Sequence, residues 1–168
     1  MKDPYKVLAE LNIPFEKYDH PAVFTVEEAE KMAGHVPGAA AKNLFLESDK
    51  NGKFYLVTLM YKKRANLRHL NNFLNEKRLH FASPEKLFAT LGVTPGAVSP
   101  MGVINDAEHK VTFVLDRDFL DEQQINFHPN VNTSSLAVAV PDFLRLMKAL
   151  GYEPLLYATP VEEPAKAG

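Results

Sequence analysis

The stretch Thr94-Pro95-Gly96-Ala97-Val98-Ser99-Pro100-Met101-Gly102 lies between a helical segment, Pro84 to Leu91, and an apolar run, Val111 to Leu115. It contains two prolines and two glycines in nine residues and no charged side chain. Proline fixes φ and lacks an N–H group, whereas glycine adopts positive φ or lets another backbone approach closely. Such a loop is rigid and can recognise a ligand with main-chain atoms. Taken alone, the same composition also fits a plain connector between a helix and a strand.

The segments before this loop alternate between helical and β-type patterns. Apolar spacing predicts a helix from Asp3 to Leu11, a short strand from Phe15 to His20, and a helix from Val26 to Ala33 that begins at a Thr25/Glu28 capping box. His35 to Ala41 is composed of small residues and predicts a flexible segment. Two strands, Asn43 to Glu47 and Phe54 to Met60, flank the hairpin signal Asn51-Gly52. Two further helices are expected, one capped by Asn66 and ending at Phe73-Leu74, the other capped by Ser83 with Pro84 in its first turn.

The segments after the loop first predict a strand from Lys110 to Leu115 and a helical turn from Asp116 to Leu120. Two more strands are predicted, from Gln124 to Phe127 and from Ser135 to Val140. A helix from Phe143 to Leu150 and an edge strand within Tyr152 to Tyr157 follow. We found no repeat or linker in the 168 residues, so the sequence predicts one domain over residues 1–158, followed by a disordered tail over residues 159–168. Helices and strands are interleaved without strict βαβ alternation. The predicted fold class is therefore α+β, with a mixed, largely antiparallel sheet surrounded by helices.

Composition narrows the possible functions. The 46% hydrophobic content supports a core, and the absence of cysteine excludes disulfides, thiol nucleophiles and cysteine metal sites. No apolar run approaches the ~20 residues that cross a membrane, and no secretory signal is visible, so the expected location is the cytoplasm. The formal net charge of −2 argues against a broadly basic surface, although a local basic cluster runs through Lys62-Lys63-Arg64, Arg68-His69 and Lys77-Arg78. That cluster is either an RNA contact or an ordinary solvated face.

Few side chains stand out for chemistry. The common phosphate-binding and zinc-protease motifs are missing, and none of the six histidines pairs with another at a helical spacing, so we predict no metal site and no cofactor. Lys42 begins an apolar strand, where its ammonium can reach a pocket mouth and contact a phosphate or a carbonyl oxygen. His128 precedes a proline between two predicted strands, where it can orient a substrate or transfer a proton. Taken alone, the spacing of each favours an ordinary surface role.

Four separated motifs change this balance when they are taken together. They are His20-Pro21-Ala22-Val23-Phe24-Thr25, Lys42-Asn43-Leu44-Phe45-Leu46, Gly96-Ala97-Val98-Ser99-Pro100 with Met101-Gly102, and His128-Pro129-Asn130 with Asn132-Thr133. Their order and spacing resemble the YbaK/ProX family of trans-editing aminoacyl-tRNA deacylases, which is related to the editing insertion of bacterial prolyl-tRNA synthetases. The resemblance spans about Tyr5 to Tyr157. The Lys42-Asn43 segment and His128 look most like the branch that clears alanine from proline tRNA.

The resemblance implies hydrolysis of the ester that joins a wrong amino acid to the terminal adenosine of tRNA, without a metal, a cofactor or a covalent intermediate. It implies catalytic roles for Lys42, Gly96 and His128. The substrate-binding residues that it implies, some by adjacency to the motifs, are Val23, Asn43, Phe45, Ala97, Val98, Ser99, Pro100 and Gly102. The expected contacts to the acceptor stem are Lys63, Arg64, Arg68 and Arg78. The implied partners are the acceptor end of tRNA(Pro) and, as a further candidate, prolyl-tRNA synthetase, and the expected state is a monomer that binds no membrane.

The identity of the amino acid stays open at this point. Alanine is smaller than proline, so a pocket that excludes proline by size can admit alanine. Serine, cysteine and 2-aminobutyrate are alternatives. A tRNA- or synthetase-binding module that has lost catalysis, and a hydrolase of another small ester or nucleotide, are the competing functional hypotheses.

Overall fold

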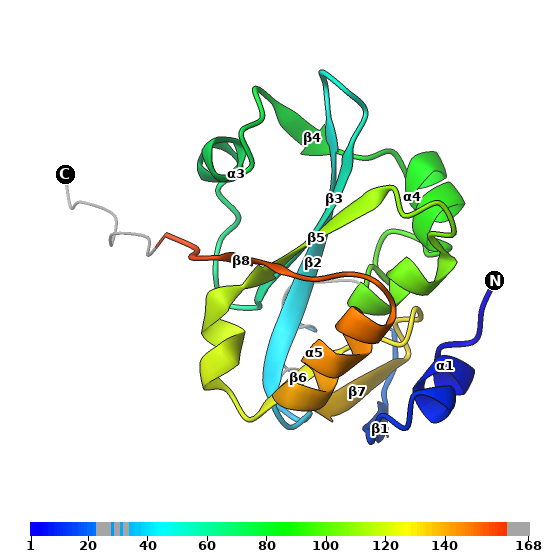
Figure 1. Ribbon diagram of the computed structural model, residues 1–168. Helices are drawn as coiled ribbons and strands as arrows, with labels where there is room; N and C mark the ends of the chain where they lie inside the picture. Colours follow the sequence, from blue (N-terminus) through cyan, green and yellow to red (C-terminus); the bar gives the residue numbers. More distant parts are fainter. Residues whose placement is uncertain (23–27, 29–30, 32–33, 161–168) are drawn as a thin grey trace.

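The computed structural model of the chain describes residues 1–22, 28, 31 and 34–160 (Figure 1). The helix predicted from Val26 to Ala33, with its cap at Thr25, lies outside the described residues apart from Glu28 and Lys31. No helix in the described ranges combines the length and apolar character needed to span a membrane.

A mixed sheet forms the centre of the molecule. Its strands, in chain order, are β1 (Glu16–Asp19), β2 (Ala39–Ser48), β3 (Phe54–Met60), β4 (Leu79–Phe81), β5 (Val111–Asp116), β6 (Gln124–Phe127), β7 (Ser134–Ala139) and β8 (Leu155–Tyr157). They are arranged as β1-β7-β6-β2-β3-β5-β8, with β4 beside β2. Four pairings are antiparallel (β1 with β7, β7 with β6, β2 with β3, and β2 with β4). The pairings of β2 with β6, β3 with β5 and β5 with β8 are parallel. The sheet therefore contains both kinds of pairing, and the predicted mixed, largely antiparallel sheet is confirmed.

The helices are α1 (Pro4–Glu10), α3 (Leu67–Phe73), α4 (Pro84–Leu91) and α5 (Val140–Ala149), with 3₁₀ helices η1 (Pro100–Asn105) and η2 (Arg117–Asp121). Two begin at the caps that the sequence predicts, Asn66 and Ser83, and α1 begins at a third cap, Asp3. The side chains of Asp3, Asn66 and Ser83 accept hydrogen bonds from main-chain N–H groups in the first turn of α1, α3 and α4. Each cap satisfies a donor that has no partner within the helix. The end of α4 falls at Gly92, whose φ of +67° is typical of a helix C-terminus.

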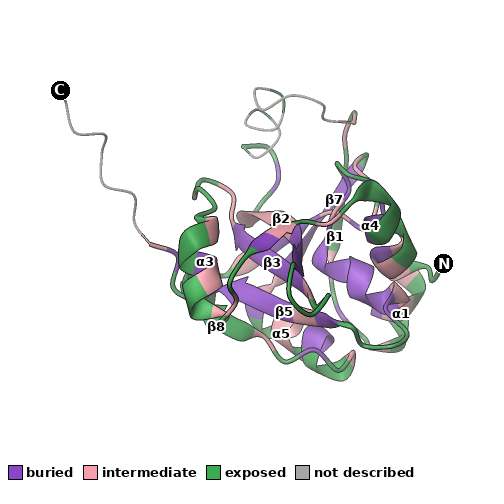
Figure 2. Ribbon diagram, turned by 90° about the horizontal axis from the view of Figure 1, so that it is seen from above, coloured by how far each residue is buried: buried purple, intermediate pink, exposed green. Residues whose placement is uncertain are grey.

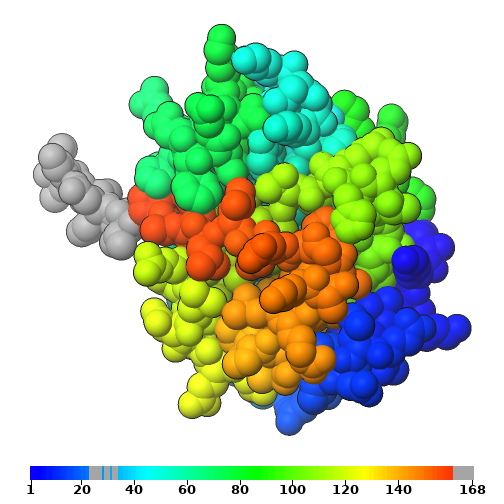
Figure 3. Space-filling view, in the orientation of Figure 1, coloured from blue at the N-terminus to red at the C-terminus, as the bar shows by residue number. Residues whose placement is uncertain are grey.

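Both faces of the sheet are covered. Because successive side chains of a strand point to opposite faces, Phe45 and Leu56 join the larger core cluster and Leu46 and Val57 the smaller one. The larger cluster includes side chains of α1, α4, η1 and α5, and the smaller one includes Leu70 of α3. Figure 2 shows the buried residues on the strands and the inner faces of the helices. In Figure 3 the segment that leads to β8 crosses the surface beside α5.

The structure differs from the sequence analysis in three places. β2 begins at Ala39, inside the segment predicted to be flexible, because pairing with Ile125 and Asn126 of β6 overrides the weak β-propensity of alanine. β4 was not predicted, since three residues show no periodicity. Thr159, assigned to the tail, is buried, while residues 161–168 lie outside the described residues.

β2 is the strand that joins the two parts of the sheet. Ala39 and Ala40 pair with β6, and the residues from Ala41 onward pair with β3. Gly38, immediately before β2, has a φ of +92°, and a Cβ atom there would lie 2.9 Å from the Cβ of Gln124. Glycine is therefore needed at this close approach to β6. The candidate site lies beside this junction.

Candidate active site

A pocket of about 220 Å³ brings together residues from four separate parts of the chain. Its described lining comprises Ala41, Lys42 and Asn43 of β2, Tyr61 at the end of β3, Gly96 and Val98 of the glycine–proline loop, and His128 at the end of β6. The three residues predicted to be catalytic, Lys42, Gly96 and His128, thus line one pocket although 86 positions separate the first from the last (128 − 42). A larger pocket, about 510 Å³, lies between α1 and the end of α5 and contains none of the motif residues.

Gly96 gives the loop its shape. Its φ is +81°, a left-handed conformation that other L-amino acids adopt only with strain. Among the described residues, the one atom within 4 Å of a Cβ atom added to Gly96 is Asn132 Nδ2, at 3.7 Å, so a methyl group would have room there. The N–H of Ala97 donates to the carbonyl of Thr94 (3.0 Å) and closes the turn, whereas the N–H groups of Gly96 and Val98 have no backbone partner within the described residues. The loop thus offers main-chain donors beside the pocket.

Asn43 attaches this loop to the sheet. Its side-chain Nδ2 donates to the carbonyl of Val98 (3.3 Å), and its Oδ1 accepts from the hydroxyl of Thr58 (2.5 Å), which is fully buried on β3. Both ends of the amide are therefore engaged. Asn43 fixes the distance between β2, which carries Lys42, and the loop, which carries Gly96.

Ser99 attaches the loop to the histidine. Its hydroxyl donates to the main-chain oxygen of His128 (2.5 Å) and accepts from the N–H of Met101 (3.0 Å). Ser99 is fully buried, and it also serves as the cap of η1. Asn130 adds a second link, because its Nδ2 donates to the carbonyl of Met101 (3.3 Å). These bonds hold the loop and the end of β6 in one rigid unit.

The protonation of His128 follows from its partners. Its Nδ1 lies 2.9 Å from the carbonyl of Ser134, which can only accept, so Nδ1 carries the proton and Nε2 is the acceptor of the neutral ring. Burial lowers the pKa of His128, and the neighbouring His20, whose ring centroid is 6.0 Å away, lowers it further against the opposing effect of the Ser134 hydrogen bond. A histidine with a lowered pKa is neutral at pH 7 and can accept a proton through Nε2.

Several of the other residues predicted to bind substrate lie behind the pocket rather than on its wall. Phe45 is in the core, stacked on Phe54 with 5.1 Å between ring centroids. Ala97, Pro100 and Gly102 are the buried part of the loop, and a Cβ atom on Gly102 would lie 2.9 Å from the Cβ of Leu91 on α4. Val98 does line the pocket, and Val23 lies outside the described residues.

Sequence reasoning missed two residues of the lining, Ala41 and Tyr61. Tyr61 directly follows the strand predicted to end at Met60 and precedes the basic run from Lys62. Its place at a strand end was the signal available in the sequence, since functional residues often lie where strands meet loops.

The predicted basic cluster divides into two kinds of residue. Lys63 is not an exposed phosphate contact, because its ammonium is 2.8 Å from the buried carboxylate of Asp116 and 2.5 Å from that of Asp118. Burial would lower the pKa of Lys63, but the hydrogen bonds to both carboxylates outweigh it and raise that pKa. Arg64, Arg68 and Arg78 are exposed, and the Arg78 side chain is 80% exposed.

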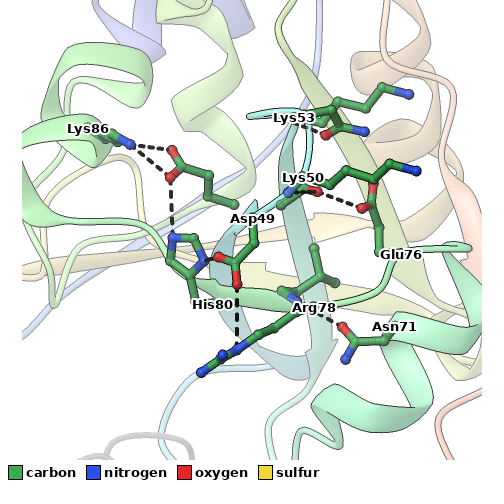
Figure 4. A network of polar contacts seen from close by, with 12 residues as sticks. Asp49, Lys50, Lys53, Asn71, Glu76, Arg78, His80 and Lys86 are labelled. Atoms are coloured by element: carbon green, nitrogen blue, oxygen red, sulfur yellow. Dashed lines mark hydrogen bonds and ion pairs between the residues drawn. The ribbon is translucent and has the colours of Figure 1, made fainter.

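Arg78 lies at the far end of β2 from Lys42. Its guanidinium is 3.5 Å from the carboxylate of Asp49, which also contacts His80 of β4, and the network continues through Glu47 to Lys86 of α4 (Figure 4). Seven residues of extended chain separate Lys42 from Asp49, which corresponds to roughly 20 Å. The pocket and the exposed arginine are therefore at opposite ends of one strand.

In residues 1–22, 28, 31 and 34–160, no group of three or more histidine and carboxylate side chains is arranged to hold a metal ion. The predicted independence from metal stays a prediction.

The fold and this pocket define the class: a single-domain α+β protein with a small pocket lined by its central strand, its glycine–proline loop and a histidine. The chain belongs to the aminoacyl-tRNA editing domain family, whose model matches residues 20–146. This confirms the resemblance to the YbaK/ProX group inferred from the four motifs.

Similar proteins carry names of the same kind. The chain is 35% identical over 153 residues to the mouse prolyl-tRNA synthetase associated domain-containing protein 1, with 89% of this chain and 90% of the relative covered. It is 34% identical over 144 residues to the prolyl-tRNA editing protein ProX of Acetoanaerobium sticklandii, with 86% and 88% covered. A solved structure described as a candidate trans-editing enzyme for prolyl-tRNA synthetase shares the fold, with a TM-score of 0.69, 20% identity, and 93% and 97% of the two chains covered.

Proposed function

We propose that the protein is an aminoacyl-tRNA deacylase that acts in trans on mischarged tRNA(Pro) and removes alanine, without a metal ion. The family and the names of the relatives support the reaction class and the tRNA. The observation that carries the proposal is the convergence of Lys42, Gly96 and His128 on one small pocket.

The proposed chemistry is a direct attack by water. The oxygen of a water molecule adds to the carbonyl carbon of the aminoacyl ester, and Nε2 of His128 accepts the proton. The main-chain N–H groups of Gly96 and Val98, together with the Lys42 ammonium, stabilise the negative charge that develops on the carbonyl oxygen. The bond from carbon to the ribose oxygen then breaks, the ribose oxygen takes up the proton, and free alanine and tRNA result. An aminoacyl ester is already activated, so positioning and charge stabilisation supply enough catalysis.

The size of the pocket supports a small amino acid. At about 220 Å³ it is smaller than the ~300–1,000 Å³ of pockets for drug-sized ligands, so it suits a group of few atoms. Because Asn43 and Ser99 hold the loop rigidly, the pocket cannot widen freely for the proline ring. Serine, cysteine and 2-aminobutyrate are close in size to alanine, and the experiment below separates them.

The proposed RNA contacts are Arg64, Arg68 and Arg78, which meet the phosphates of the acceptor stem while the terminal nucleotide reaches the pocket. Lys63 is left out because two carboxylates neutralise it. Prolyl-tRNA synthetase is the proposed protein partner, and a monomer in the cytoplasm is the proposed working form.

The test is a deacylation panel with Ala-, Ser-, Cys- and Pro-tRNA(Pro), each with and without a chelator. We expect hydrolysis of Ala-tRNA(Pro) that survives chelation and Pro-tRNA(Pro) that stays intact. Lys42→Met should lower kcat/KM about 10²–10³-fold, since it removes a charge next to the oxyanion. Lys50→Met, an exposed lysine at the hairpin tip, is the control. Salt-dependent tRNA binding without hydrolysis of any substrate would show a binding module instead.

A further inference from the structure

His20 begins the first of the four motifs, and the mechanism described above gives it no role. It directly follows β1, and its main-chain N–H donates to the carbonyl of Thr133 (2.9 Å). Its ring lies beside the ring of His128, with 6.0 Å between the ring centroids and 58° between the ring planes. The fold therefore places a second imidazole next to the proposed base.

The ring of His20 is anchored at both nitrogens. Its Nδ1 lies 3.0 Å from the carbonyl oxygen of Pro21, which can only accept, so Nδ1 carries a proton. Its Nε2 lies 2.9 Å from the hydroxyl of Ser135, a buried residue of β7. Because a hydroxyl both donates and accepts, this second contact persists whether His20 is neutral or protonated. The position of the ring is thus fixed in both protonation states.

The start of β7 also holds the ring of His128. The carbonyl of Ser134 accepts from Nδ1 of His128 (2.9 Å), and the hydroxyl of Ser134 donates to the carboxylate of Asp19 (2.8 Å). Asp19 pairs with Ser134 in the register of β1 and β7, so His20 and Ser135 each follow directly after this pair. Two neighbouring residues of β7 therefore contact the two histidine rings, one each, and the end of β1 fastens that part of β7.

Other charged and titratable side chains surround the two rings, namely Lys17, Asp19, Lys42 and Tyr61. Hydrogen bonds from Ser134 and Lys17 lower the pKa of Asp19, so a carboxylate stands on the side of His20. A positive charge on His20 repels a second one on His128, and the two rings titrate as a coupled pair. Burial is the main cause that lowers the pKa of His128, and charge on His20 lowers it further.

We propose that His20 is a positioning residue of the editing reaction, which holds the ring of His128 in place and sets a second protonatable group beside it. The inference rests on the proposed function, in which His128 is the base. His20 is not among the described residues that line the pocket, so it acts on the reaction through His128. Because catalysis depends strongly on the placement of the reacting groups, a fixed neighbour of the base contributes to the rate.

Kinetics on Ala-tRNA(Pro) test this role with two variants. His20→Phe keeps an aromatic ring beside His128 but loses the charge and the hydrogen bonds, whereas His20→Gln keeps an amide that can bond to Ser135. In both variants kcat should fall by about 10-fold, as part of the ~10²–10⁴-fold that a general base contributes, while KM stays near the wild-type value.

The pH profile separates this role from a merely structural one. Without the repulsion from His20, the pKa of His128 rises, and the acid limb of kcat/KM should move to higher pH in both variants. A lower kcat with an unmoved acid limb would show a structural role and overturn the proposal. His109→Gln, an exposed histidine stacked on Tyr152, is the control and should keep the wild-type kcat and pH profile.

A double substitution tests whether His20 acts only through His128. In the background of His128→Gln, His20→Gln should lower kcat no further, and a second loss as large as in the wild type would contradict the assignment. If the His20 variants do not fold, Ser135→Ala keeps both rings and removes one hydrogen bond of His20. It should lower kcat without raising KM, and full activity would overturn the proposal.

The two proposals fail in different ways. The ring signals of ¹³C-labelled histidine report the titration of His128 in the full chain without any hydrolysis, and this titration should occur at higher pH in His20→Phe. If it does so while no mischarged tRNA is hydrolysed, the coupling of the two rings stands and the deacylase function falls. If Ala-tRNA(Pro) is hydrolysed and His20→Phe keeps the wild-type kcat and pH profile, the function stands and the role of His20 falls.

Discussion

Gly96 combines a left-handed backbone with a place in the lining of the pocket. Gly96→Ala should cost about 1–2 kcal/mol of folding stability from the strained φ and, in addition, should raise KM for the mischarged tRNA because Gly96 lines the pocket. Urea unfolding and steady-state deacylation measure the two effects.

Gly52→Ala is the matched control for this substitution. Gly52 has a φ of +67° in the β2–β3 turn, with no atom within 4 Å of an added Cβ. It should lose similar stability and keep full activity. If both variants keep full activity, Gly96 is needed for the left-handed backbone conformation and not for substrate access to the pocket.

His128 leads to a prediction about pH. Because burial lowers its pKa in the folded protein, the neutral base persists at neutral pH and protonates only below the ordinary histidine range. We expect kcat/KM to be flat around pH 7 and to fall on the acid side, and His128→Gln to remove that fall together with most of the activity.

The same shift in the pKa of His128 affects stability. Between its folded and its unfolded pKa, the unfolded chain binds more protons than the folded one. The contribution of His128 to stability is therefore complete above the unfolded pKa and is lost as the pH falls toward the folded pKa. Urea unfolding across this range should show a shallower acid loss in His128→Gln, and identical pH profiles for the two proteins would contradict the assignment.

At the residue scale, sequence reasoning brought Lys42, Gly96 and His128 into one site only because four motifs occurred together. Spacing alone left each of them as an ordinary turn or strand-end residue. It also could not show that Lys63 is paired, since the carboxylate that neutralises it, Asp116, is 53 positions away and on another strand. The packing roles of Ser99 and Gly102 were hidden for the same reason, because a composition shows no tertiary partner.

At the scale of elements, the 60–63 turn depends on one buried carboxylate. Asp116 accepts from the N–H groups of Met60 and Asp118 and from the ammonium of Lys63. Asp116→Ala should cost about 3–5 kcal/mol, because a half-buried cation and buried donors lose their partner. Chemical denaturation measures the loss of stability.

Asp118→Ala removes the exposed partner of the same lysine. Its side chain is 60% exposed, so the expected cost is below about 1 kcal/mol. Equal losses of stability in Asp116→Ala and Asp118→Ala would mean that the two carboxylates together hold the turn, rather than the buried one alone.

Elements with local signals were the ones predicted well. The caps at Asn66 and Ser83 and the Asn-Gly turn are encoded within a few residues. Two other features depend on partners far along the chain. The start of β2 pairs with β6, and the three-residue β4 pairs with the end of β2. No local pattern can report such a pairing.

At the scale of the whole molecule, the pocket and Arg78 stand at opposite ends of β2, so binding of the acceptor end is expected to be separable from hydrolysis. Arg78→Ala should weaken tRNA binding and make the dependence of log K on log salt shallower by about 0.7–0.9, as expected for one lost phosphate contact. kcat should stay unchanged.

Lys148→Ala, an exposed charge near the end of α5, is the control. Its salt dependence should equal that of the wild type. If Arg78→Ala leaves the slope of log K against log salt unchanged, Arg78 makes no phosphate contact and the acceptor stem binds to another face of the protein.

The glycine–proline loop has a consequence for how this protein can diversify. Main-chain donors are not encoded by any one side chain, so substitutions at the exposed Thr94 and Pro95 leave the chemistry at the loop largely intact. Heritable changes in the amino acid that is removed must then arise on the other walls, at Ala41, Asn43 and Tyr61. A library randomised at those three positions should yield variants with new amino-acid preferences, whereas one randomised at Thr94 and Pro95 should yield mostly active enzymes of unchanged preference.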